Sequence, residues 1–169
     1  MNLIQDQTDN LSARSAEVLK FTASELFQRL FREGIELVEE TAAYLDGDGR
    51  TESRLLTRTA GLVYASESMK LTTRLMQVAS WLLVQRAVNE GNISADVAYE
   101  PRYRLSERDQ KPTPLPADLP IALVEYILRA ERLYDRTHYL DQKMYVQAAD
   151  EAAPNGVLSQ LERVRAAFG

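Results

Sequence analysis

The chain has 169 residues, with 20 basic and 25 acidic side chains and a formal net charge of −5. Hydrophobic residues make up 45% of it, which suits one folded domain long enough to bury a core. The acidic balance argues against a nucleic-acid partner, because phosphate binding calls for a basic surplus. The lack of cysteine excludes disulfides, thiolate metal sites and cysteine nucleophiles.

We expect a cytoplasmic protein without a membrane span. The N-terminal residues Met-Asn-Leu-Ile-Gln-Asp-Gln have neither the cationic start nor the apolar run of a secretory signal. No stretch approaches the ~18 uninterrupted apolar residues that a transmembrane helix needs. The missing cysteines also fit a reducing compartment.

Residues 1–20 are polar with scattered apolar positions, and we expect them to form a flexible arm. The first helix is predicted over residues 22–46. Thr22 and Glu25 have the spacing of a capping box, in which each side chain satisfies an amide at the helix start. Residues at steps of three and four then form one face from Phe27 to Leu45. The glycines of residues 46–49 end the helix.

The second helix is predicted over residues 51–90, and at ~1.5 Å per residue it would be ~58 Å long. Large and small side chains alternate along its seam, at Leu55, Thr59, Leu62, Ser66, Met69, Thr73, Met76, Ser80, Leu83 and Ala87. Small residues in such a seam indicate close contact between helices. Met69, Met76, Trp81 and Leu83 are therefore expected in the core or in a dimer interface. For Trp81, packing is a better interpretation than contact with a cofactor.

Several prolines mark residues 91–117 as a long linker, and a loop of this length in a compact domain usually has a function. The third helix is predicted over residues 118–149, with Asp118 as its cap and Pro120 in its first turn. Residues 150–169 are expected to be a flexible tail. Four apolar residues of the tail have the spacing of a short amphipathic segment that folds on a partner: Leu158, Leu161, Val164 and Phe168.

These elements predict an all-α fold, an antiparallel three-helix bundle over residues 21–149 with a very long middle helix, an N-terminal arm and a C-terminal tail. Such a bundle alone would leave part of the long helix uncovered, so self-association along it is expected. In the linker, Tyr99, Arg102, Tyr103 and Arg104 are candidates for binding a partner, because tyrosine and arginine are frequent in binding hot spots. The alternative is a solvated loop attached to the bundle.

The sequence offers few side chains in the arrangements that catalysis or metal binding requires. His138 is the only histidine, so a di-iron site with two Glu-x-x-His pairs is excluded, and a hydrogen-bonded histidine between helices is the simpler interpretation. The glutamates of the first helix fall on its outer faces, where solvation is a simpler role than acid–base chemistry. We predict no catalytic residue, no metal and no cofactor. A helical metalloenzyme and a DNA-binding regulator are the distant alternatives, which metal analysis and a gel shift at low salt would test.

Two long stretches, Arg32 to Arg50 and Tyr64 to Gly91, resemble the alphaproteobacterial RcdA family, the regulators of CtrA degradation. The resemblance covers about residues 25–149 and includes no short catalytic motif. It implies a three-helix bundle that forms a homodimer and has a flexible C-terminal tail. It also implies a non-enzymatic adaptor for the ATP-dependent protease ClpXP.

The resemblance further implies the partners. Such adaptors join a ClpX/ClpP complex primed by a CpdR-like receiver protein, and they hold CtrA-like cargo directly or through a PopA-like cyclic-di-GMP effector. The second interpretation of the sequence is a dimeric helical scaffold with no role in protease delivery. A pull-down of ClpX components would separate the two.

Overall fold

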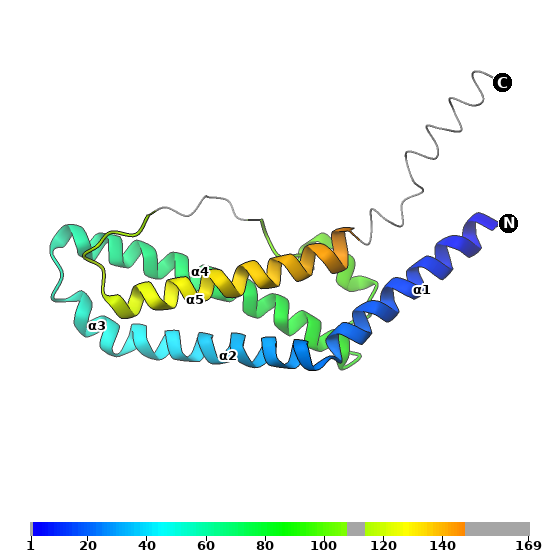
Figure 1. The fold of residues 1–169 in the computed structure, drawn as a ribbon, viewed down its shortest axis with the longest axis horizontal. Helices are drawn as coiled ribbons and strands as arrows, with labels where there is room; N and C mark the ends of the chain where they lie inside the picture. Colours follow the sequence, from blue (N-terminus) through cyan, green and yellow to red (C-terminus); the bar gives the residue numbers. More distant parts are fainter. Residues whose placement is uncertain (1, 108–113, 148–169) are drawn as a thin grey trace, which may run out of the picture.

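The structure is a computed structural model that describes residues 2–107 and 114–147. Three long helices, α2 (Glu25–Asp46), α4 (Arg58–Asn89) and α5 (Ile121–Asp141), lie side by side, and α1 (Asn2–Thr22) leaves the bundle at one end (Figure 1). The shorter elements are α3 (Asp48–Ser53), the 3₁₀ turns η1 (Val97–Tyr99) and η2 (Pro101–Tyr103), and the π-helical η3 (Gln142–Gln147). The predicted helical bundle is confirmed, and the described residues include no strand.

Residues 2–22 form a helix, where the sequence predicted a flexible arm. Val18 and Thr22 are buried against the bundle, whereas Leu11 and Ile4 continue the same stripe into solvent. Thr22 belongs to the end of α1, where its hydroxyl donates to the carbonyl of Leu19. Its neighbour Ser24 caps α2 instead, at 3.2 Å between Ser24 Oγ and the Phe27 nitrogen. The polar residues around a narrow apolar stripe concealed this helix in the sequence.

The predicted helix over residues 51–90 is interrupted after Ser53. Thr57 begins α4, because its hydroxyl accepts a hydrogen bond from the Ala60 nitrogen. The short α3 before it is held by a 2.7 Å hydrogen bond from the Tyr44 hydroxyl to Glu52. The third helix is also shorter than predicted: Asp118 makes no cap, α5 begins at Ile121, and the chain is π-helical from Gln142.

The core lies where α2, α4 and α5 meet. The buried face of α2 runs from Phe27 to Thr41 as predicted and ends at Tyr44. Its central residue is Gly34, and a Cβ atom at this position would lie 2.4 Å from Leu82 Cδ1 of α4. A side chain at position 34 would therefore force the fully buried Leu82 side chain to move. The largest fully buried side chains around this contact include Trp81, Tyr134, Phe27, Leu37, Leu82, Leu123 and Leu133.

We therefore expect Gly34→Ala to lower the free energy of unfolding by about 1–3 kcal/mol, because the added methyl group overpacks a full core. Gly61→Ala is the matched control, since a Cβ there meets nothing within 4 Å. It should be neutral or stabilise α4 by up to ~1 kcal/mol through helix propensity. Urea denaturation followed by circular dichroism measures both. Equal gains in stability would contradict the close approach of α2 and α4.

Candidate functional site

The described residues do not form a metal centre, since no group of three or more histidine, aspartate or glutamate side chains could hold an ion there. His138 stacks on Tyr134 with ring centroids 5.7 Å apart. Glu40 pairs with Arg129 at 2.6 Å, and Glu33 pairs with Arg136. These two glutamates thus join α2 to α5. None of the helices in the described part of the chain is long and apolar enough to cross a membrane.

A buried ion pair fastens the linker to the bundle. Arg104 Nη1 lies 2.8 Å from Asp141 Oδ1, and the Asp141 carboxylate is fully buried. The same oxygen accepts a 2.7 Å hydrogen bond from Trp81 Nε1 of α4, so Trp81 is a core residue. Arg104 also donates to the carbonyl of Ala98, at 2.9 Å from Nη2. Burial raises the pKa of Asp141 and lowers the pKa of Arg104, so each charge depends on the other.

Aromatic residues surround this ion pair at the end of α5. The Arg104 guanidinium lies 3.3 Å from the ring centroid of Tyr145, whose hydroxyl donates to Gln85 of α4. Burial raises the pKa of Tyr145 to about 12. Tyr99 contacts the Tyr145 ring edge-on at 4.8 Å, and Arg14 of α1 lies 4.9 Å from the centroid of the Tyr99 ring. The cluster therefore joins α1, the linker, α4 and η3 close to where the tail begins.

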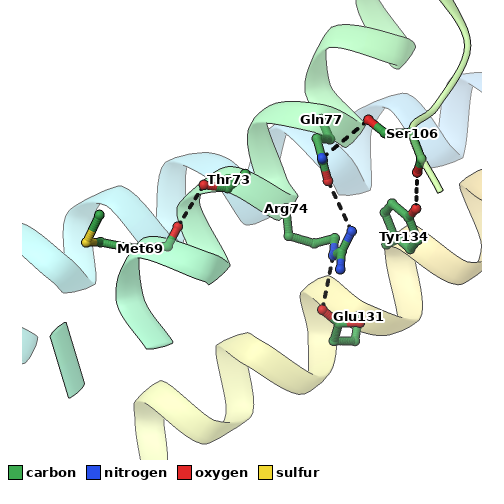
Figure 2. A network of polar contacts seen from close by, with 7 residues as sticks. All are labelled: Met69, Thr73, Arg74, Gln77, Ser106, Glu131 and Tyr134. Atoms are coloured by element: carbon green, nitrogen blue, oxygen red, sulfur yellow. Dashed lines mark hydrogen bonds and ion pairs between the residues drawn. The ribbon is translucent and has the colours of Figure 1, made fainter. Parts of the chain in front are cut away.

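A second polar network holds the linker a few residues further on (Figure 2). Arg74 of α4 donates from Nε to Glu131 of α5 at 3.2 Å and from Nη1 to Gln77 at 3.1 Å. Gln77 Nε2 donates to the Ser106 hydroxyl at 3.4 Å, and the Tyr134 hydroxyl donates to the Ser106 carbonyl. The linker is thus attached to the bundle at Arg104 and again at Ser106.

The four linker residues predicted to bind a partner are in two different environments. Arg104 and Tyr99 take part in the buried cluster, which gives their side chains a structural role. Arg102 keeps 65% of its side chain exposed, pairs with Glu100 at 2.7 Å and lies 4.7 Å from the ring centroid of Tyr103. Partner binding through Arg102 and Tyr103 stays a prediction. The predicted tail residues Leu158, Leu161, Val164 and Phe168 lie outside the described residues.

The outward side of α4 is the other candidate surface. Leu62, Met69, Met76 and Leu83 follow one another at intervals of seven residues and are 68%, 73%, 65% and 53% exposed. Figure 2 shows Met69 pointing away from Glu131 of α5. The opposite side of the helix, with Tyr64, Leu71, Val78, Trp81, Leu82 and Gln85, is buried. Of the residues predicted in the core or an interface, only Trp81 is therefore in the core.

Between these large residues the outward side carries small uncharged ones. We use the name outer face of α4 for the whole set: Leu62, Ala65, Ser66, Met69, Thr72, Thr73, Met76, Ala79, Ser80 and Leu83. Thr73 donates its hydroxyl to the carbonyl of Met69 at 3.0 Å, which leaves the surface between the methionines with little hydrogen-bonding capacity. Exposed apolar surfaces of this extent are typical of interaction sites.

Comparison with known proteins relates the chain to one protein family and to a solved structure. Residues 18–168 match a family described as a protein of unknown function, DUF1465. The crystal structure of RcdA from Caulobacter crescentus CB15 is similar at 54% sequence identity, covering 76% of this chain and 98% of that chain, with a TM-score of 0.64. No curated protein sequence matches the chain. Most of α1, residues 2–17, precedes the part that matches the family.

The buried cluster predicts that the two linker arginines differ in their effect on stability. Arg104→Ala leaves the Asp141 carboxylate buried without a counter-ion and should lower the free energy of unfolding by about 3–5 kcal/mol. Arg102→Ala, at an exposed ion pair, should change it by less than ~1 kcal/mol. Urea denaturation of the two variants measures the difference.

A double variant provides the control for Arg104→Ala. Arg104→Met combined with Asp141→Asn removes both charges and keeps an oxygen for the Trp81 indole. It should recover most of the lost stability, because no charge then stays buried alone. Equal effects of Arg104→Ala and Arg102→Ala would contradict the structural role of Arg104.

Proposed function

This chain belongs to the DUF1465 family, and from its 54% identity with RcdA we propose that it is an RcdA-like, non-enzymatic adaptor that delivers regulatory proteins to the ClpXP protease. The observation that carries the proposal is that this identity extends over 98% of the RcdA chain. The proposed adaptor works as a homodimer in the cytoplasm. Its proposed partners are a CpdR-like receiver protein, a PopA-like cyclic-di-GMP effector and CtrA-like cargo.

The proposed mechanism is an increase in effective concentration. An adaptor that holds cargo on one surface and the protease complex on another makes their encounter nearly intramolecular. The gain can reach ~10²–10⁴ without any new contact between protease and cargo. This mechanism needs a stable scaffold, and the packing of α2, α4 and α5 against one another supports that requirement.

Arg102 and Tyr103 are the proposed partner contacts in the linker. Their segment η2 lies between Arg104, which is held by Asp141, and η1, where Ala98 is fully buried. Because the neighbouring residues are attached to the bundle, little conformational entropy is lost when a partner binds the exposed side chains. The four apolar tail residues Leu158, Leu161, Val164 and Phe168 are the second proposed contact.

Reconstituted degradation tests the proposed function. ClpXP, the receiver-domain protein and a candidate cargo are incubated with and without the full chain, and cargo loss is followed over time. We expect faster loss with the full chain and no acceleration with a chain truncated after Pro154. The truncated chain should keep its helicity, since the described bundle ends before it.

A matched pair of arginines tests the linker contact in the same assay. Arg102→Ala should slow delivery, whereas Arg29→Ala, at an equally exposed i,i+4 ion pair of α2, should not. If no primed cargo is degraded faster although the protein is folded and dimeric, delivery is contradicted and the scaffold interpretation is supported.

A further inference from the structure

The outer face of α4 is an uncharged surface on a helix whose other side is already packed. Its four large residues span 21 positions, which corresponds to about 32 Å along the helix. The charged side chains of Lys70 and Arg86 lie at its edges, and Arg58 lies one turn before Leu62, at the end of the face. Four methionine and leucine side chains, each more than half exposed, are a large apolar area for a water-facing helix.

The pattern of large and small residues on this face is the same when it is read in either direction. The midpoint lies between Thr72 and Thr73. At equal distances on the two sides of it, Met69 corresponds to Met76 and Leu62 to Leu83. The small residues correspond as well, Ala65 to Ser80 and Ser66 to Ala79. A two-fold interface brings the same patch of both copies together, residue i against j and j against i. With the axis at this midpoint, methionine meets methionine, leucine meets leucine, and the small residues meet one another.

We propose that the outer face of α4 binds the same face of a second copy, antiparallel, with the two-fold axis between Thr72 and Thr73. This inference rests on the homodimer of the proposed function and assigns its interface. Met69 then lies beside Met76 of the other copy, and Leu62 beside its Leu83.

The spacing of large and small residues fits this arrangement. Large side chains at every seventh position fit between side chains of a facing helix, as in coiled coils. The small residues Ser66, Thr73 and Ser80, each four positions after a large one, allow the two helices to approach to the ~8–10 Å of packed pairs. A partner with an ordinary charged surface would fit this face less well, because its charges would lose water without gaining a counter-ion.

The antiparallel arrangement also puts the two copies' candidate partner sites at opposite ends of the paired helices. Gln85, which belongs to the buried cluster near the start of the tail, lies level with Ala60 of the other copy. The two clusters are then about 38 Å apart along the paired helices. Each end of the dimer presents one Arg102 segment, so a dimer can hold two partners at once.

Single introduced cysteines test which residues of the two α4 helices lie side by side. The natural chain has no cysteine, so every disulfide must come from the introduced residue. In the proposed dimer, Met69 is displaced by about 10 Å along the axis from Met69 of the other copy. A disulfide needs Cα atoms within about 4.4–6.8 Å. Under mild oxidation, Met69→Cys alone and Met76→Cys alone should give little covalent dimer, and their equimolar mixture should give at least tenfold more.

Thr72→Cys alone, beside the axis, should also form a covalent dimer. Glu39→Cys, exposed on α2, is the control for random collisions and should form none. Strong crosslinking of Met69→Cys with itself would show a parallel pair and overturn the proposal. The absence of crosslinks in the mixture and in Thr72→Cys would also overturn it, and a partner of another kind would then cover the face.

The second test introduces charged side chains into the outer face of α4. Met69→Lys combined with Met76→Lys should give a helical monomer by light scattering, whereas Lys70→Met at the edge should stay dimeric. A dimeric Met69→Lys/Met76→Lys variant would overturn the proposed interface. These measurements need no protease, so a failed interface and a failed adaptor function give separate results.

Discussion

The structure depends on one constraint: α4 carries uncharged side chains on two opposite sides, and the bundle of one chain covers only one of them. Its inner side, with Trp81, Leu82 and Val78, fills the space between α2 and α5. Its outer face is equally free of charge but stays in solvent in the single chain. Gly34 of α2 lets Leu82 come close enough for the inner side to pack fully. Because the inner side is complete, the outer face stays exposed in the single chain.

The linker is the part of the chain that most needs polar contacts. Its buried ion pair between Arg104 and Asp141 removes two charges from water, which costs stability unless geometry and hydrogen bonds compensate. The Trp81 indole and the Ala98 carbonyl provide such hydrogen bonds. The result is a defined path for the linker over the bundle. Arg102 is thereby kept at the surface, two residues from Arg104, whose side chain is only 15% exposed.

The sequence was sufficient to predict the helical class and the buried face of α2, because one side of that helix is apolar at the helical period. It identified the seam of α4 by its spacing but not its environment. A helix with two uncharged sides has no single periodic signal, so the core and the outer face could be told apart only in the fold. The symmetric pattern of large and small residues about Thr72 and Thr73 is visible in the sequence. It indicates an interface only because the structure shows that both halves of the pattern are exposed.

Other features depended on contacts between distant residues. Arg102 and Arg104 lie in the same sequence segment, so the local sequence does not distinguish them. Only the position of Asp141 in the fold shows that Arg104 forms the buried ion pair and Arg102 the exposed one. Gln85 and Tyr145 meet across 60 positions, as do Trp81 and Asp141, which no local pattern reveals. The capping box at Thr22 was misleading because the true cap, Ser24, lies two residues later in the same polar segment.

Sedimentation equilibrium of the unmodified full chain, over a range of micromolar concentrations, tests the central claim most directly. In the proposed dimer a second copy covers the outer face of α4, so the account predicts a mass of twice the 19.1 kDa of one chain. A mass of 19.1 kDa throughout that range would contradict it.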